Sequence, residues 1–142
     1  MPPALPMKEL IVEASIESLE EVMDFINNEL ERKTCSSELL GNIILAVEEI
    51  FVNIASYAYQ SPGGSATVSI AAGEEAVIRF EDTGKPYNPL DHPDPDVTKP
   101  LMERDIGGLG IFLVKTIMDK VDYMRIDNKN VLVMTKKLAQ PF

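Results

Sequence analysis

The sequence of 142 residues contains no tryptophan, one histidine and one cysteine. The single cysteine, Cys35, excludes an intramolecular disulfide, and its polar surroundings, TCSSE, lack the histidine or second cysteine of a zinc site. No apolar run approaches the roughly 20 residues that span a bilayer. The N-terminus, MPPALPMKEL, also lacks the basic and then apolar order of a signal peptide. We therefore expect a free thiol in a cytoplasmic protein that has no membrane partner.

Basic residues are scarce as well. Lysine and arginine total 13 against 23 aspartates and glutamates, a formal net charge of -10, and no basic run is longer than the pair Lys136 and Lys137. Such a chain attracts neither the phosphate backbone of a nucleic acid nor an anionic lipid surface. We expect a protein or small-molecule partner and no nucleic acid.

Apolar residues, in contrast, make up 45% of the chain, which suffices for the core of one compact domain over residues 1–142. Five prolines between residues 84 and 100 exclude a regular element there. The apolar periodicity elsewhere predicts strands at 8–15, 65–72, 76–82, 121–127 and 130–138, and helices at 16–32, 36–59 and from the glycines near 107 to about 120. This order predicts an α/β two-layer sandwich, in which helices cover one face of an antiparallel or mixed sheet.

Glu49 and Asn53 lie in the long, mostly apolar helix, within the segment LAVEEIFVNIASYAY, residues 45–59. Glu49 and Asn53 are one turn apart, so their side chains lie on one face. A carboxylate and an amide in such surroundings need partners, which a metal ion, a water molecule or a phosphate would supply. A satisfied polar pair at the rim of the core is the alternative.

A second polar position lies at the end of a strand, in FEDTGKP, residues 80–86. Strand alternation directs Asp82 to the same side as Ile78 and Phe80, where apolar residues belong. A buried carboxylate requires donors, and the amino group of adenine is one, while Gly84 would allow the backbone close to a flat ring. An aspartate that closes an Asx-turn explains the letters DTG equally well.

Three glycines, Gly107, Gly108 and Gly110, precede the apolar helix in RDIGGLGIFLVKTIMDKVDY, residues 104–123. Glycines at a helix start leave backbone N–H groups open at the positive end of the helix dipole, where a phosphate binds. A flexible link is the alternative, since a lone G-G-x-G does not exclude it.

In this order the three segments resemble the N box, the G1 box and the G2 box of the GHKL ATPases, the superfamily of DNA gyrase and the sensor histidine kinases. The sequence is most similar to the anti-sigma factor serine/threonine-protein kinase family, in AVEEIFVNIASYAY, FEDTGKPYNP, GGLGIFLVKTIMDKVDY and the terminal NVLVMTKKL. The resemblance implies the Bergerat (histidine-kinase-like ATPase) fold and binding of ATP or ADP with Mg²⁺. It also implies phosphorylation of a serine on an anti-anti-sigma antagonist, sequestration of a sigma factor, and a homodimer.

By position, the resemblance makes Glu49 the general base and Asn53 a ligand of Mg²⁺, an ion that prefers oxygen donors. Asp82 would accept a hydrogen bond from the adenine amino group, with Gly84 beneath the ring. Residues 88–106 would form a lid over the nucleotide. The other residues assigned to nucleotide binding are Arg104, Gly107, Gly108, Leu109 and Gly110; Arg104 and Lys99 carry charges that suit a γ-phosphate.

Three positions depart from the family pattern. Pro86 replaces the second glycine of the superfamily's D-x-G-x-G, Tyr57 replaces a histidine common in this branch, and Val131 replaces a threonine near the adenine. His92, within DHPDPD, is expected in the lid rather than in a metal site. The alternative function is an ATP- or ADP-binding regulatory module that switches protein partners without phosphoryl transfer, within or outside sigma-factor control.

Overall fold

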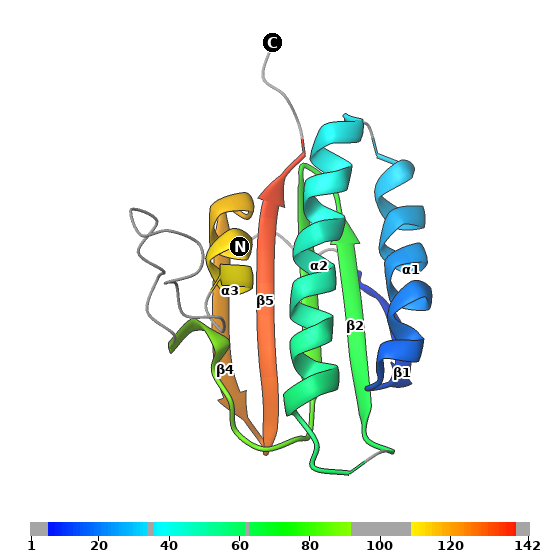
Figure 1. Cartoon of the computed structure of the whole chain (residues 1–142). Coiled ribbons are helices and arrows are strands. Elements are labelled where there is room, and N and C mark those ends of the chain that lie inside the picture. Colours follow the sequence, from blue (N-terminus) through cyan, green and yellow to red (C-terminus); the bar gives the residue numbers. More distant parts are fainter. Residues whose placement is uncertain (1–5, 34–35, 62, 92–108, 139–142) are drawn as a thin grey trace.

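The computed structural model describes residues 6–33, 36–61, 63–91 and 109–138 (Figure 1). The elements follow one another as the sequence predicts. They are β1 (Lys8–Glu13), the 3-10 turn η1 (Ile16–Ser18), α1 (Leu19–Glu31), α2 (Ser37–Tyr57), β2 (Ser65–Ala72), β3 (Glu75–Asp82), the 3-10 turn η2 (Pro89–Asp91), α3 (Leu109–Ile117), β4 (Lys120–Ile126) and β5 (Lys129–Lys137). Two helix ends were predicted too late: α2 stops at Tyr57 rather than Tyr59, and Lys120 begins a strand instead of closing a helix.

The five strands form one sheet in the order β1-β2-β3-β5-β4, and every neighbouring pair is antiparallel. Of the two sheets that the sequence allowed, antiparallel and mixed, the structure has the antiparallel one. The helices α1, α2 and α3 all lie on one face of it (Figure 1). The chain therefore has the expected α/β two-layer architecture, with α2 running along the middle of the sheet.

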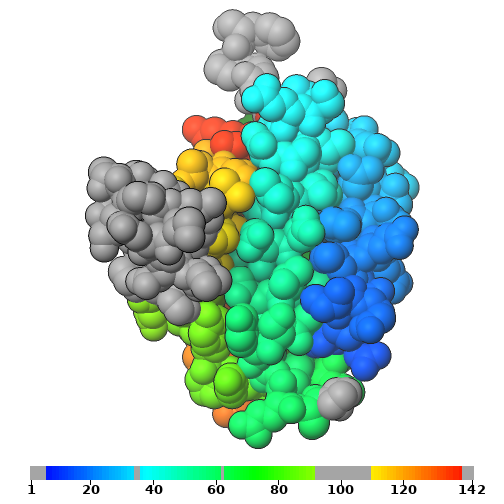
Figure 2. All heavy atoms as spheres, viewed as in Figure 1, coloured from blue at the N-terminus to red at the C-terminus, as the bar shows by residue number. Residues whose placement is uncertain are grey.

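Helix α2 is the centre of the hydrophobic core. Its start is fixed by Ser36, whose Oγ accepts a hydrogen bond from the backbone N–H of Leu39 at 3.1 Å, the ordinary N-cap contact. Side chains from α1, α3 and the sheet pack around its buried residues, which are Ile43, Ala46, Val47, Ile50 and Phe51. Figure 2 shows α1 and α2 side by side over the sheet, with the surface of α3 beside α2.

Helix α2 also has the length and composition of a membrane span, the only helix in the described parts of the chain that does. The sequence prediction counted uninterrupted apolar residues and so found no such segment. In the structure one side of α2 is packed into the core, as in a core helix of a folded domain.

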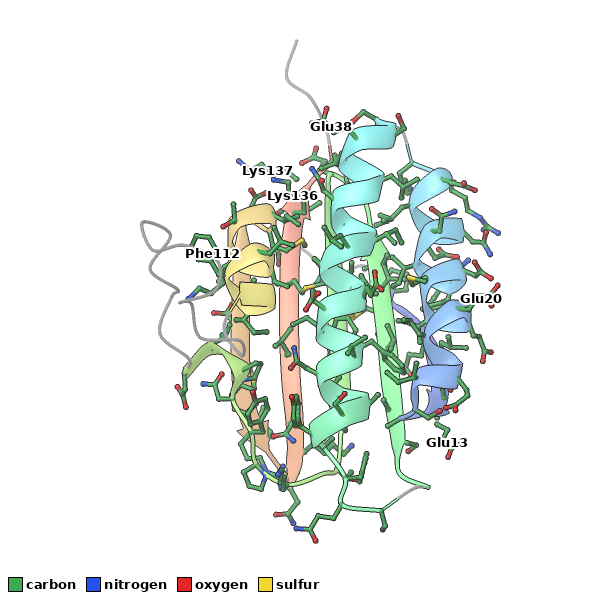
Figure 3. All side chains as sticks on the ribbon, viewed as in Figure 1. Glu13, Glu20, Glu38, Phe112, Lys136 and Lys137 are labelled. Atoms are coloured by element: carbon green, nitrogen blue, oxygen red, sulfur yellow. The ribbon has the colours of Figure 1, made fainter. Side chains whose placement is uncertain are left out.

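The outer side of α1 is acidic, and Glu20 points away from α2 (Figure 3).

The hairpin between β4 and β5 sets the register that matters for the site. Asp127 and Asn128 both have positive φ, 51° and 64°, which aspartate and asparagine tolerate better than other side chains do. The turn is therefore one residue earlier than the predicted Asn128 and Lys129. It places Asn130 opposite Asp82 on β3. Since neighbouring residues of a strand face opposite sides, Val131 points away from the helices.

Candidate functional site

The polar pair on α2 is arranged as the helical spacing predicts. The side-chain Nδ2 of Asn53 donates to the backbone oxygen of Glu49 at 2.9 Å. Within the described parts of the chain no group donates to the Oδ1 of Asn53, and Asn53 lines a cavity between α2 and the sheet. That oxygen is therefore available to a hard cation such as Mg²⁺.

The carboxylate of Glu49 lies against the first turn of α3. A Cβ added to Gly110 would come 2.8 Å from Cδ of Glu49 and closer still to Oε2, so no other residue fits there unless Glu49 moves. The Glu49 carboxylate makes no hydrogen bond with the residues that the structure places. The start of α3 is the positive end of its dipole, which suits both this carboxylate and an anion. The first and third sequence segments thus meet at Glu49 and Gly110.

Asp82 is 6% exposed and faces the core side of β3, as strand alternation predicts. Its Oδ1 accepts hydrogen bonds from the backbone N–H of Gly84 and from Nδ2 of Asn130, each at 2.9 Å. The Asx-turn offered as an alternative is therefore present. Its Oδ2 receives no hydrogen bond from any residue placed in the structure. One oxygen of this buried carboxylate holds the turn, and the other remains as an acceptor.

A cavity of about 40 Å³ joins the second segment to the first. It is mostly apolar, and three polar residues, Asn53, Asp82 and Asn130, contribute to its wall. The volume is that of a few water molecules and well below the roughly 300–1,000 Å³ of typical ligand pockets. A purine ring therefore enters only if a side chain of the wall moves.

Tyr87 and Pro89, which follow β3, close one side of this cavity. The Tyr87 ring lies 5.9 Å from that of Tyr57 between centroids, so the tyrosine in place of the expected histidine contacts the cavity wall. Burial, and then the neighbouring Tyr57, raise the pKa of Tyr87 above its ordinary value of 10.0. Its hydroxyl is therefore neutral at physiological pH.

Gly84 is buried and has a packing role of its own. A Cβ there would lie 2.6 Å from the backbone carbon of Ala58, just beyond the end of α2, and the next residue, Lys85, donates its N–H to the Ala58 oxygen at 2.9 Å. Arg125 on β4 donates to the Gly84 oxygen at 2.9 Å. The absence of a side chain is thus required by the contact with α2, whether or not a flat ring also lies over this glycine.

Asn130 is the site residue that the sequence did not single out. It is 7% exposed and contacts Asp82, Lys85, Tyr87 and Tyr123. The resemblance matched Val131 to a threonine near the adenine, but Val131 faces the other side of the sheet from Asn130, and Asn130 lines the cavity. A polar residue directly before the apolar run VLVM was the one available signal.

Several assigned residues lie outside the described part of the chain. They are Lys99, Arg104, Gly107 and Gly108, together with His92 and most of the expected lid over 88–106. Leu109 is placed as the first residue of α3, without a description of its side chain. Among the residues that are described, no group of three or more His, Cys, Asp or Glu could hold a metal ion. A magnesium ion would therefore depend on Asn53 and on oxygens of a bound phosphate.

Comparison with known proteins finds one matching domain family and several similar proteins. The family described as the histidine kinase-like ATPase domain matches residues 12–136. The serine-protein kinase RsbW of Halalkalibacterium halodurans is 33% identical over 111 residues, 71% of this chain, and the chain spans only 64% of that relative's length. The serine/threonine-protein kinase BtrW of Bordetella bronchiseptica is 28% identical over 111 residues, which cover 76% of this chain and 78% of that protein.

A solved structure supports the same fold. The crystal structure of the RsbU and RsbW domains of a Mycobacterium tuberculosis protein aligns with a TM-score of 0.64 over 96% of this chain and 33% of that one. The sequences are 14% identical, so the likeness bears on the fold alone. This chain thus shares its fold with about a third of that structure.

Proposed function

The chain belongs to the histidine kinase-like ATPase domain family, its curated relatives are serine-protein kinases, and on that premise we propose that it is an ATP-dependent protein serine kinase. The observation that carries this proposal is the arrangement along α2. Asn53 and the buried Asp82 share one cavity, and Glu49 lies one turn away against the start of α3. A nucleotide with its base at Asp82 and its phosphates toward Glu49 would lie along this helix.

Base recognition would belong to Asp82. Its Oδ1 already accepts two hydrogen bonds, whereas its Oδ2 has no donor among the placed residues and can accept one from a ligand. The exocyclic amino group of adenine is such a donor. This fit supports ATP or ADP as the ligand.

The phosphate end would be held by Asn53 and by the segment that begins α3. Asn53 offers Oδ1 to Mg²⁺, which prefers oxygen ligands and keeps several of them from water and phosphate. Such an ion would neutralise charge that develops on the transferred phosphoryl group. Gly110 brings the backbone of α3 to the Glu49 carboxylate, so phosphate, base and acceptor serine would meet there.

Glu49 would act as the general base. Its carboxylate is free of hydrogen bonds with the placed residues and can accept the proton of the attacking serine hydroxyl. The serine oxygen then forms the new bond to the γ-phosphorus as the bond to the ADP oxygen breaks. Positioning supplies much of the rate in such reactions, since a misplacement of about 1 Å costs on the order of a hundredfold.

The partners follow from the resemblance to anti-sigma factor kinases. We propose that the protein sequesters a sigma factor in the cytoplasm and phosphorylates a serine on its anti-anti-sigma antagonist, as a homodimer. The net charge of -10 favours partners with basic surfaces over nucleic acid.

The test is transfer of label from γ-labelled ATP with Mg²⁺ to candidate antagonist proteins. Glu49→Gln should abolish labelling and leave ATP binding intact. Glu48→Gln is the matched control, because Glu48 is the adjacent carboxylate but points about 100° away around α2. Binding of ATP without labelling of any candidate antagonist would refute the kinase and favour the partner switch. Equal loss in both variants would refute the role of Glu49.

A further inference from the structure

The best-connected polar side chain in the cavity wall is Asn130. Its Nδ2 donates to Oδ1 of Asp82 at 2.9 Å and to the backbone oxygen of Lys85 at 2.8 Å. Its Oδ1 accepts from the Tyr123 hydroxyl at 2.5 Å and from the backbone N–H of Tyr87 at 3.3 Å. Both N–H groups and both lone pairs of the amide are used, so the amide is held in one orientation.

This orientation decides how much of Asp82 remains for a ligand. A carboxylate oxygen has two lone pairs, and those of Oδ1 are taken by Asn130 and by the N–H of Gly84. Only Oδ2 remains. Asp82 can therefore accept hydrogen bonds from a base through a single oxygen, and it cannot act as a bidentate acceptor.

Purines differ in what they offer such an acceptor. Adenine presents one amino group beside the N1 acceptor. Guanine presents N1–H and the 2-amino group side by side, a pair of donors that matches both oxygens of a carboxylate. At Asp82 the second guanine donor would stay buried without a partner. The resulting loss of affinity is about tenfold or more, because an unpaired buried donor is expensive.

On the basis of the proposed ATP binding, we propose that Asn130 is a positioning residue that makes the site select adenine over guanine nucleotides. It does so by saturating Oδ1 of Asp82. The selectivity depends on Asn130 and Asp82 together. Without Asn130, the Asp82 carboxylate could accept hydrogen bonds from both N1–H and the 2-amino group of guanine.

The experiment measures the dissociation constants of ATP, GTP and inosine triphosphate by calorimetry. The wild-type protein should prefer ATP to GTP by about tenfold or more. Asn130→Ala frees one lone pair on Oδ1, so GTP should bind more tightly and the preference should fall about tenfold. Inosine triphosphate, which lacks the 2-amino group, should gain nothing. A general loosening of the site would weaken all three nucleotides together.

Arg125→Ala is the structural control. It removes a hydrogen bond to the same turn, at the Gly84 oxygen, and leaves Oδ1 of Asp82 saturated. Its ratio of ATP to GTP affinity should stay within about twofold of the wild-type ratio. If Asn130→Ala does not fold, Tyr123→Phe loosens Asn130 by one hydroxyl and should lower the ratio about threefold.

The failures are distinguishable. Equal wild-type affinity for ATP and GTP would overturn the role of Asn130 and leave the proposed function standing. The role of Asn130 would also be overturned if folded Asn130→Ala kept the wild-type ratio of ATP to GTP affinity, or if Arg125→Ala lowered that ratio as much as Asn130→Ala does. A wild-type protein that binds none of the three nucleotides would remove the proposed function and this inference with it.

Discussion

The contact between Gly110 and Glu49 allows a test of the site that needs no ligand. In Gly110→Ala the new Cβ would overlap the Glu49 carboxylate and displace it. Moving a side chain off its rotamer costs about 1 kcal/mol. Alanine in place of glycine within a helix stabilises by up to about 1 kcal/mol. The two effects nearly cancel, so Gly110→Ala alone should change the free energy of unfolding very little.

In a Glu49→Ala background the overlap is gone and only the gain in helix stability remains. Gly110→Ala should then stabilise the protein by about 1 kcal/mol, which makes the coupling energy of the two substitutions about 1 kcal/mol. Urea unfolding of the four proteins measures it. Gly41→Ala is the matched control, because a Cβ at Gly41, in α2, meets no atom within 4 Å and its effect should add to that of Glu49→Ala. Additivity within about 0.5 kcal/mol for Gly110 would refute the contact.

Three further substitutions test other parts of the account. Gly84→Ala would force a Cβ against the Ala58 backbone, which cannot rotate away, and should lower the free energy of unfolding by about 1–3 kcal/mol in urea titrations; a neutral effect would contradict the packing. The hydrogen bond from the backbone N–H of Lys137 is the main cause that lowers the pKa of Asp119 below its ordinary value of 3.8. The ionised Asp119 therefore stabilises the fold above pH 3.8, and this stabilisation is lost as the pH falls through the lowered pKa. Asp119→Asn should therefore destabilise the protein at pH 7 and have little effect well below pH 3.8, and an equal effect at both would refute it. Asn53→Ala should remove the dependence of ATP affinity on Mg²⁺ in calorimetry, and a retained dependence would reject Asn53 as the ligand.

Local sequence patterns were enough to predict the orientation of several site residues. The spacing of Glu49 and Asn53 fixed their common face, because a helical turn is the same wherever a helix forms. Alternation along β3 fixed the inward direction of Asp82 for the same reason. Both facts depend on a few neighbouring residues, and both are found in the structure.

The rest depended on contacts between distant segments. Asn130 meets Asp82 across 48 positions of sequence, and the hairpin at Asp127 and Asn128 decides which face it takes. A shift of one residue turns every side chain of a strand to the other face, so matching Val131 to the family pattern by position could not reveal that Asn130 lines the cavity. The cavity is lined by side chains from α2, β3, β5 and the segment after β3, so its small size depends on packing between distant segments, which no local pattern predicts.

Binding of an adenine nucleotide, as proposed, depends on one oxygen of Asp82, the Oδ2 that receives no hydrogen bond from the placed residues. Calorimetric titration of ATP with Mg²⁺ into the wild-type protein and into Asp82→Asn tests it most directly. The wild type should show a saturable binding heat, and Asp82→Asn should lose affinity by about tenfold or more. An amide has one oxygen, so it can accept either from Gly84 and Asn130 or from the adenine amino group, and its NH₂ then faces the other donors. No heat with ATP or ADP, or equal affinity in the two proteins, would contradict it.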